Sequence, residues 1–169
     1  MRESGDMDST LQILLRLNKS GVDYVVIGGM AAVLHGSAIA TNDIDICISA
    51  EDESFRKIVA AFADVHPRYR MRPENPPVTP DHPWLTGVKN FYLLTDIGQL
   101  DILGEVPGIG DFNVIQHRTI EFDFGMMKCR VLDIPTLIAA KQQANRPKDR
   151  QSIAELSVIL KRLNESRRE

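Results

Sequence analysis

Two aspartates stand inside a segment that otherwise has the composition of a buried β-strand. The segment TNDIDICI, residues 41 to 48, places Asp43 and Asp45 two positions apart among isoleucines. Because side chains alternate between the two faces of a strand, both carboxylates are expected on one face. Like charges this close repel each other unless a cation lies between them, and Mg²⁺ prefers carboxylate oxygens. The pair therefore indicates either a magnesium site or a strand end whose carboxylates face water.

A glycine pair upstream of these aspartates is a second place where chemistry is possible. The run YVVI is typical of a strand, and it ends at Gly28-Gly29, where the short helical segment MAAVLH begins. Backbone N–H groups at such a turn, together with the positive end of a helix dipole, can bind phosphate. The Walker phosphate-binding pattern is absent, and tight turns also require glycine for steric reasons alone. A phosphate cradle and a purely steric turn are both open.

Taken together, the residues IGGMAAVLHGSAIATNDIDICI resemble the signature of the nucleotidyltransferase superfamily, which includes DNA polymerase beta and kanamycin nucleotidyltransferase. In that superfamily a glycine pair, a short helix and an acidic pair on a strand follow one another in this order. The resemblance implies that Gly28, Gly29 and Thr41 bind the nucleotide. It also implies that Asp43 and Asp45 are catalytic metal ligands, with a third carboxylate on a later strand.

Asp101, in the run QLDIL, is the expected third carboxylate. Alternation places it opposite Leu100 and Ile102, so it too is a charged group in an apolar strand. Asp96 is the weaker rival, because it stands beside Gly98 in an expected turn. The implied reaction is metal-dependent transfer of a nucleoside monophosphate from a nucleoside triphosphate to a hydroxyl, with two Mg²⁺ ions shared among the carboxylates. The acceptor is unidentified, and RNA, a protein and a small molecule are all open.

The segment IPTLIAAKQQANRPKDRQSIAEL is similar to the helices that follow the catalytic sheet in small bacterial nucleotidyltransferase-like proteins. The resemblance implies that Lys141, with Arg146 and Lys148 nearby, binds the triphosphate, as cations beside phosphate do. A structural interpretation is equally good. In that interpretation Lys141 complements the dipole at the end of its helix, while Arg146 and Lys148 pair with Asp149 on the surface.

The chain departs from the superfamily pattern at two positions. Ile39 stands where many relatives have an arginine two residues before the threonine, which implies a missing phosphate or substrate contact. Ser152 stands where an acidic residue is common, three positions after Asp149. A first alternative to an enzyme is therefore a catalytically degenerate nucleotidyltransferase fold that binds nucleotide or a protein without turnover. A second is one component of a toxin–antitoxin pair, with the other component as its partner.

His35 and Trp84 could touch substrate and Cys47 could lie near the metal, but packing is the commoner role for each type. His35 matches a His-Gly step of the superfamily pattern, and such a residue more often packs against or caps a short helix. Trp84 could stack on a base, or it could anchor its loop to the core. Cys47 shares the strand face of the two aspartates and is expected to be a small buried hydrophobe.

The elements that must position these residues follow from the hydrophobic periodicity. A helix ending at Ser20-Gly21 precedes the strand 24–27, the short helix, the strand 43–48 and a helix over 51–63. Hairpins are predicted over 90–103 and 122–132, and helices over 135–145 and from Pro147 onward, the first capped by Asp133. Six of the nine prolines fall within residues 66–86, so we expect an ordered surface loop or lid there, without regular elements.

We expect an α/β or α+β fold, in which a small, mixed, twisted sheet carries the carboxylates and helices pack on it. The resemblance implies that residues 1–132 form a nucleotidyltransferase-like core, which includes the proline-rich loop 66–86. Residues 133–169 form a helical segment packed on that core. The C-terminal helices are predicted to form one wall of a cleft and the proline-rich loop the other.

Composition limits the classes of protein that the chain can belong to. It has 169 residues, 43% of them apolar, and a net charge of −3, so it can bury one core but has no overall attraction to nucleic acid. Cys47 and Cys129 lack any metal-site spacing, which fits a reducing cytoplasm. The segment MRESGDMDST is polar and acidic where a secretion signal would be basic and then apolar, so none is expected, and the longest apolar run is too short to span a bilayer. We expect a cytoplasmic protein without membrane association, and leucines near Leu163 leave a homodimer open.

Overall fold

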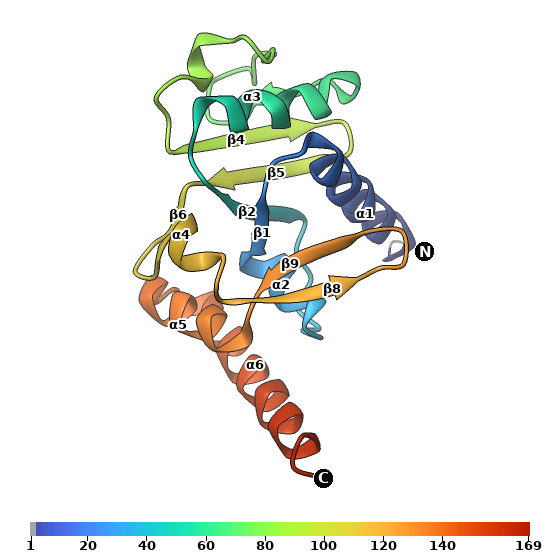
Figure 1. Ribbon diagram of the computed structural model, residues 1–169, viewed down its shortest axis with the longest axis vertical. Coiled ribbons are helices and arrows are strands. Elements are labelled where there is room, and N and C mark those ends of the chain that lie inside the picture. The colour runs from blue at the N-terminus through green and yellow to red at the C-terminus, as the bar shows by residue number, and fades with distance from the viewer. Residues whose placement is uncertain (1–2) are drawn as a thin grey trace.

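The computed structural model describes residues 3–169, and a seven-stranded mixed sheet forms its centre (Figure 1). The strands lie in the order β3-β4-β5-β2-β1-β9-β8. β2 is parallel to β5 and β1 is parallel to β9, whereas the other neighbours are antiparallel. Their bounds are β1 (Tyr24–Ile27), β2 (Asp43–Ile48), β3 (Arg68–Tyr69), β4 (Asn90–Thr95), β5 (Gly98–Leu103), β8 (Thr119–Asp123) and β9 (Lys128–Leu132).

Helices cover both faces of this sheet (Figure 1). On one face α1 packs on α3 and β5, and on the other α2 packs on α5. α6 packs on α5, and its last turns project from the body of the protein, so Leu163 is 43% exposed and lies outside the core. The helices are α1 (Glu3–Ser20), α2 (Gly28–Leu34), α3 (Asp52–Ala61), α4 (Phe112–Ile115), α5 (Ile134–Ala144) and α6 (Pro147–Ser166).

The central strands separate an apolar face from a polar one. Ile44 and Ile46 of β2 pair in register with Leu100 and Ile102 of β5, and all of these are buried beneath α1 and α3. By alternation Asp45 lies on the opposite face of β2. The sheet therefore holds its charged residues on the face away from the α1–α3 core.

The predicted fold class and both predicted hairpins are confirmed. β4 and β5 pair in antiparallel register around a turn at Thr95 to Gly98, and β8 and β9 form the second hairpin. Asp133 caps α5, because its carboxylate accepts a hydrogen bond of 2.8 Å from the backbone N–H of Thr136. Within residues 3–169, no helix combines the length and apolar composition needed to cross a membrane.

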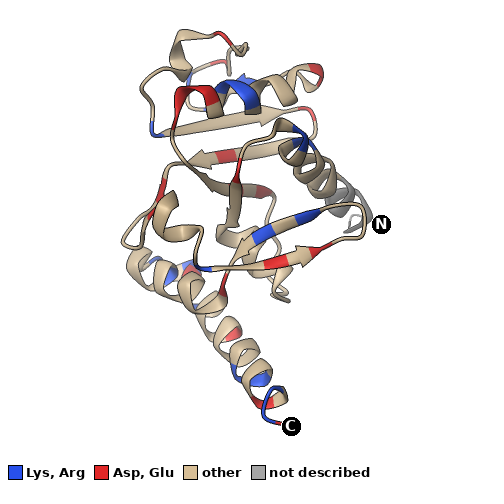
Figure 2. Cartoon of the chain, in the orientation of Figure 1, with Lys and Arg blue, Asp and Glu red and all other residues tan. Residues whose placement is uncertain are grey.

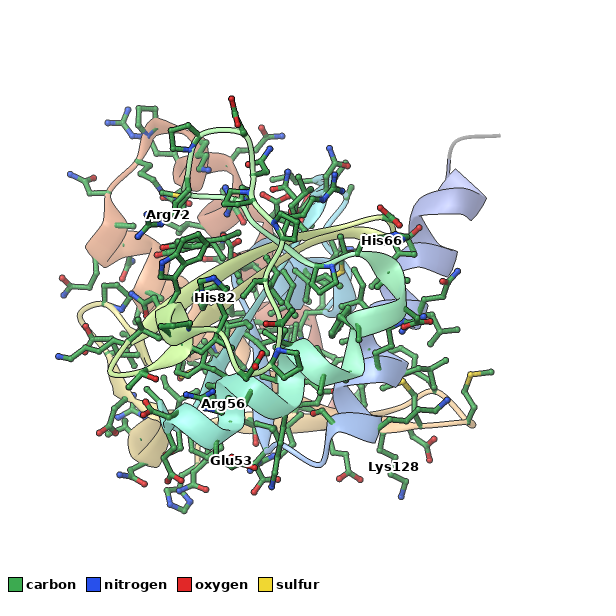
Figure 3. All side chains as sticks on the ribbon, turned by 90° about the horizontal axis from the view of Figure 1, so that it is seen from above. Glu53, Arg56, His66, Arg72, His82 and Lys128 are labelled. Carbon is green, nitrogen blue, oxygen red and sulfur yellow. The ribbon has the colours of Figure 1, made fainter. Side chains whose placement is uncertain are left out.

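The proline-rich loop differs from the prediction in one respect, because part of it joins the sheet. Arg68 and Tyr69 form β3, an edge strand paired with β4, and the Tyr69 ring stacks on Phe91 with centroids 4.5 Å apart. Prolines stand at 67 and 73, so the N–H groups between them are free to pair at a sheet edge. Figure 3 looks down on this loop, with Arg72 and His82 on one side of the view and His66 on the other.

Several short elements in addition to β3 were not predicted. They are the two-stranded ribbon β6 (Glu105–Val106) and β7 (Gly110–Asp111), and the single turns of 3₁₀-helix η1 (Ala63–Val65) and η2 (Pro83–Leu85). The one-turn helix α4, which follows the ribbon, was also missed. Elements of two to four residues are too short for hydrophobic periodicity to reveal.

Candidate active site

The turn after β1 brings its backbone against the strand that carries the aspartates. Ile27, the last residue of β1, pairs with Asp45 across the β1–β2 ladder. Gly28 then opens α2 with a φ of +65°, a left-handed conformation that favours glycine. A Cβ atom at Gly28 would overlap the carboxylate of Asp45, and one at Gly29 would lie 3.1 Å from Thr41 Oγ1. The glycine pair is therefore required here, because polar side chains of the next strand lie directly against this backbone.

We expect Gly28→Ala to lower the free energy of unfolding by about 2 to 3 kcal/mol, since a left-handed conformation costs a non-glycine residue about 1–2 kcal/mol and the methyl group must displace the Asp45 carboxylate. Urea denaturation measures the loss. The matched control is Gly21→Ala, because Gly21 has a φ of +75° but a Cβ there meets nothing within 4 Å. Equal losses in the two variants would show that the contact with Asp45 has no energetic weight.

The three predicted carboxylates lie on one face of two adjacent strands. Asp45 and Asp101 are direct partners in the parallel β2–β5 register, and Asp43 lies two positions before Asp45. Burial, together with the charges of Asp101 and Asp43, raises the pKa of Asp45 to about 6. Among the described residues, no hydrogen-bond donor reaches the Asp45 carboxylate. An ionised Asp45 therefore needs a cation that the neighbouring side chains do not supply at contact distance.

Arg70, which was not predicted, contacts the third carboxylate. Its Nη2 donates a hydrogen bond of 2.5 Å to Asp101 Oδ1, and the two side chains are 28% and 18% exposed. This hydrogen bond, opposed by burial and aided by the charges of Asp101, Asp43 and Asp45, raises the pKa of Arg70. The proline-rich loop thus brings a permanent positive charge to one end of the acidic row.

A cleft of about 560 Å³ opens between the glycine turn and the C-terminal helices. One side of it carries Gly28, Gly29, Asp43 and Asp45. The facing side comes from α5 and the start of α6 and includes the cations of Lys141, Arg146 and Lys148. Leu103 at the end of β5, with Val106, Pro107 and Gly108 after it, contributes further apolar surface.

The predicted outer wall of the cleft is wrong. No described residue of the proline-rich loop lines the cleft, because β3 holds that loop at the edge of the sheet, beyond β4 and β5. The predicted inner wall, formed by the C-terminal helices, is present. Arg70 reaches Asp101 from the outer side of the row, and Asp101 does not line the cleft.

The C-terminal side of the cleft is organised around Asp149, which is only 2% exposed. Arg146 donates from Nε and Nη2 to the two oxygens of Asp149, at 2.8 and 3.1 Å. Lys141 Nζ lies 3.8 Å from Asp149 Oδ1, and burial lowers the pKa of Lys141 while the charge of Asp149 opposes that change. In Figure 2 basic and acidic positions accordingly meet where α5 is followed by α6. The predicted Arg146–Asp149 ion pair is present, but its predicted surface location is wrong for Asp149, since this first-turn residue of α6 faces α5.

Both departures from the superfamily pattern line the cleft. Ile39 is half-buried on the same side as Thr41, so an apolar side chain stands where a cation was expected. Ser152 is 6% exposed and lies on α6 about one turn after Asp149. The cations of this cleft come instead from the facing wall.

His35 and Trp84 have packing roles in this structure. His35 Nε2 lies 2.8 Å from the carbonyl oxygen of Leu132, and its ring meets Phe122 edge-on at 5.2 Å. Trp84 packs beside Tyr69, with ring centroids 5.6 Å apart, so it anchors the proline-rich loop. Neither side chain lines the cleft described above.

Asp96 and Cys47 are also accounted for without substrate. Asp96 lies at the β4–β5 turn, where its carboxylate is hydrogen-bonded to His66 Nδ1 and forms an ion pair with Arg68. Cys47 is fully buried, and burial raises its pKa to about 12, so it is a neutral thiol at physiological pH. Asp101 is therefore the better placed of the two candidates for the third carboxylate.

The acidic side of the cleft has the donor chemistry of a divalent-cation site, although the full ligand set is not assembled. Asp43 and Asp45 present hard carboxylate oxygens to the cleft, and Asp45 has no donor of its own. Across residues 3–169, no group of three histidine, cysteine, aspartate or glutamate residues is placed to hold one metal ion. Asp101 is instead bound to Arg70. Mg²⁺ commonly takes one or two carboxylates and completes its shell with water and substrate phosphates, so the pair in the cleft fits such an ion.

Solved structures place this architecture in one class. The chain is similar to the lincosamide antibiotic adenylyltransferase LnuA bound to lincomycin, with a TM-score of 0.64 and 18% identity over 90% of this chain and 96% of that one. It is similar to a candidate nucleotidyltransferase of Thermotoga maritima, with a TM-score of 0.56 and 19% identity over 94% and 92% of the chains. It is also similar to ANT(2'')-Ia in complex with adenylyl-2''-tobramycin, with a TM-score of 0.55 and 15% identity over 96% of this chain and 99% of that one.

The chain has the nucleotidyltransferase fold. The resemblance that begins at the glycine pair and ends at the aspartates is confirmed at the level of the fold by these structures. No sequence-family profile and no curated protein sequence matches the chain.

The contact of Arg70 with Asp101 and the burial of Asp149 were not predicted from the sequence. Arg70 belongs to RYRMR, where arginines alternate with other residues, and this alternation is the signal that places them on one face of an extended segment. Asp149 stands three positions after Arg146 at a helix start, which is the spacing of a capping box. The alternation does not indicate that Arg70 contacts Asp101, and the helix-start spacing fits the predicted Arg146–Asp149 pair but does not indicate that Asp149 is buried.

Proposed function

We propose that this protein is a Mg²⁺-dependent nucleotidyltransferase, which moves a nucleoside monophosphate from a nucleoside triphosphate to a hydroxyl group of an acceptor. The observation that carries the proposal is one cleft with chemically opposite sides. Asp43 and Asp45 line one side, and the cations of Lys141 and Arg146 line the other. A polyphosphate with a divalent cation is the ligand whose charges complement both sides.

The residues of the cleft have distinct roles in this proposal. Gly28 and Gly29 let the backbone N–H groups at the start of α2 approach the phosphates without a side chain between them. Thr41, against Gly29, contributes a hydroxyl at the same turn. Lys141 and Arg146 compensate the charge of the triphosphate from the opposite wall.

The reaction needs no protein nucleophile. The oxygen of the acceptor hydroxyl attacks the α-phosphorus and releases its proton to solvent, the bond between the α-phosphorus and the oxygen that bridges to the β-phosphate breaks, and pyrophosphate leaves with that oxygen. Asp43 and Asp45, with Asp101 as the third carboxylate, would hold Mg²⁺, which when bound would supply positive charge beside the oxygens on which negative charge develops. The protein contributes positioning and preorganised charge, which are the main sources of rate enhancement in phosphoryl transfer.

A small molecule with a hydroxyl group is the acceptor class that we propose. Two similar structures, aligned over at least 90% of both chains, carry a lincosamide antibiotic or adenylylated tobramycin. The net charge of −3 adds no general attraction for RNA. Both structures concern adenylyl transfer, so ATP is the first nucleotide to test.

Calorimetric titration with ATP in the presence of Mg²⁺ tests the nucleotide site. We expect the natural protein to bind with a dissociation constant between about 1 μM and 1 mM, the usual range for enzyme substrates. The double variant Asp43→Asn, Asp45→Asn should lose at least about tenfold in affinity, because the bound cation loses both carboxylates of the cleft. Chelation of Mg²⁺ should weaken binding to the natural protein to a similar extent.

The control for this titration is Asp96→Asn, which removes an aspartate outside the cleft and should leave ATP affinity unchanged. Absence of ATP binding by the natural protein would overturn the proposal. Binding without transfer to any hydroxyl acceptor would instead favour a catalytically degenerate nucleotide-binding protein. Ile39 in the cleft is the observation that favours this second candidate.

A further inference from the structure

A row of side chains crosses the open face of the sheet from the cleft to its edge. Asp45 of β2 pairs with Asp101 of β5, which pairs with Tyr92 of β4. The next partner in register is Arg70, whose backbone N–H donates a hydrogen bond of 3.0 Å to the carbonyl oxygen of Tyr92. Sheet register therefore brings the Arg70 guanidinium and two of the predicted metal ligands into one line.

The position of Arg70 is fixed by several contacts in addition to its ion pair. Its guanidinium lies over the Tyr92 ring, 5.5 Å from the centroid. The preceding residue, Tyr69, stacks on Phe91. The loop beyond it is anchored by Arg72, which is labelled in Figure 3 and whose guanidinium lies over the Trp84 ring, 4.1 Å from the centroid. The guanidinium is thus held beside Asp101 by a folded loop.

The contact between Arg70 and Asp101 changes what the acidic row can bind. It takes up Asp101 Oδ1 at 2.5 Å, the kind of oxygen that a divalent cation would use. The Arg70 guanidinium also places a fixed positive charge beside Asp101, and this charge would repel a second cation bound to the same carboxylate. Asp43 and Asp45 face the cleft without such a competitor at contact distance among the described residues.

We propose that Arg70 competes with a metal ion for Asp101, so that the protein binds one divalent cation tightly through Asp43 and Asp45 and a second one only weakly. This inference rests on the proposed function, because it assumes that the acidic row is a metal site. Arg70 then sets the number of ions in the site. Its positive charge also neutralises part of the negative charge of the three carboxylates, as a second cation would. The proline-rich loop that carries Arg70 is in this way a determinant of metal stoichiometry.

Counting bound Mn²⁺ by electron paramagnetic resonance tests the inference without any measurement of activity. Mn²⁺ is a suitable probe, because it shares the preference of Mg²⁺ for oxygen ligands. We expect one tight ion per chain in the natural protein. In Arg70→Gln, which keeps a hydrogen-bonding side chain but removes the charge, a second ion should bind at least about tenfold more tightly than in the natural protein.

The matched control is Arg68→Gln, since Arg68 lies two residues before Arg70, in β3, and pairs with Asp96 instead of Asp101. It should leave the Mn²⁺ count unchanged. Adding Asp101→Asn to Arg70→Gln should abolish the gained ion, and Asp45→Asn in the natural background should abolish the first one. Thermal melting of each variant establishes that it is folded.

Two ions of similar affinity in the natural protein would overturn the inference. So would weaker Mn²⁺ binding in folded Arg70→Gln, since this result would mean that Arg70 positions Asp101 for the metal. If the natural protein binds one ion and Arg70→Gln binds no second one, the inference fails while the proposed function stands. If neither protein binds any ion, both the inference and the metal dependence of the proposed function fail.

Discussion

Replacing Asp45 with asparagine should lower nucleotide transfer by roughly two to three orders of magnitude, while making the metal-free protein more stable. The loss of activity follows from the loss of a preorganised negative charge at the cation, by analogy with the removal of one charge-stabilising group from other active sites. Asparagine has nearly the shape of aspartate, so the Gly28 turn beneath it keeps its packing. The change is therefore chiefly one of charge.

The gain in stability follows from the pKa of Asp45. Burial, with the charges of Asp101 and Asp43, raises that pKa from 3.8 to about 6 in the folded protein without metal. Since one pKa unit corresponds to about 1.4 kcal/mol, ionised Asp45 costs the folded state about 3 kcal/mol at neutral pH. Asp45→Asn removes most of this cost, and we expect its free energy of unfolding to exceed that of the natural protein by about 2 kcal/mol at pH 7.5.

The pH dependence gives this prediction its sign. Between pH 3.8 and about 6 the folded protein holds a proton on Asp45 that the unfolded chain has lost, so the contribution of Asp45 to stability falls as pH rises through this window. The advantage of Asp45→Asn should therefore be largest above pH 6 and vanish below about pH 4. Urea denaturation with a chelator present, at a series of pH values, measures it.

Asp96→Asn is the control for both parts of this prediction, because that carboxylate lies at the β4–β5 turn and is well exposed. It should retain transfer activity and show no gain in stability at neutral pH. An Asp45→Asn protein that keeps its activity would remove Asp45 from the catalytic site. One that is less stable at every pH would mean that Asp45 has a structural role instead of a metal-binding one.

Some parts of the site could be predicted from the sequence and others could not. The predictable parts lie within one continuous segment or follow from a known strand order. The glycine turn and Asp43 and Asp45 belong to one continuous segment, in which the alternation of a strand and the conformational freedom of glycine determine the local geometry. The position of Asp101 beside Asp45 depended on strand order, which the superfamily resemblance supplied. These parts could be predicted because each needs only a local rule or a known topology.

The contacts of Arg70 and the burial of Asp149 depend instead on where distant segments pack. Arg70 lies in a proline-rich stretch that composition alone marks as loop, and its partner Asp101 is 31 residues away. The wall of the cleft was misassigned for the same reason, since only the pairing of β3 with β4 shows that this loop lies at the sheet edge. Aspartate is usually a surface residue, but the packing of α6 on α5 buries Asp149.

Asp149→Ala should lower the free energy of unfolding by about 3 kcal/mol, because removing the buried Asp149 carboxylate leaves the largely buried Lys141 ammonium without its counter-charge. Asp149 is 2% exposed and accepts hydrogen bonds from the side chain and from the backbone N–H of Arg146, the residue just before α6. Lys141, whose side chain is 11% exposed, would lose its nearby counter-charge.

The pH dependence of this loss has the opposite sign to that of Asp45. Burial raises the pKa of Asp149, but the hydrogen bond and charge of Arg146, with the charge of Lys141, outweigh it and hold the pKa below 3.8. The stability that Asp149 contributes is therefore complete above pH 3.8 and is lost as pH falls through the lower folded value. The difference between the natural protein and Asp149→Ala should shrink in acid, in contrast to the growth of the Asp45→Asn difference above pH 4.

A double-mutant cycle distinguishes a buried charge network from simple loss of packing. Lys141→Met removes the lysine charge and keeps the length of the apolar stem, and the double variant Lys141→Met, Asp149→Ala leaves no uncompensated lysine in the cleft wall. The double variant should be less destabilised than the sum of the two single variants by about 1 kcal/mol or more. Additive losses would show that Lys141 and Asp149 are energetically independent. Lys141 would then be held in the cleft by packing alone, and its charge would be available in full to a bound triphosphate.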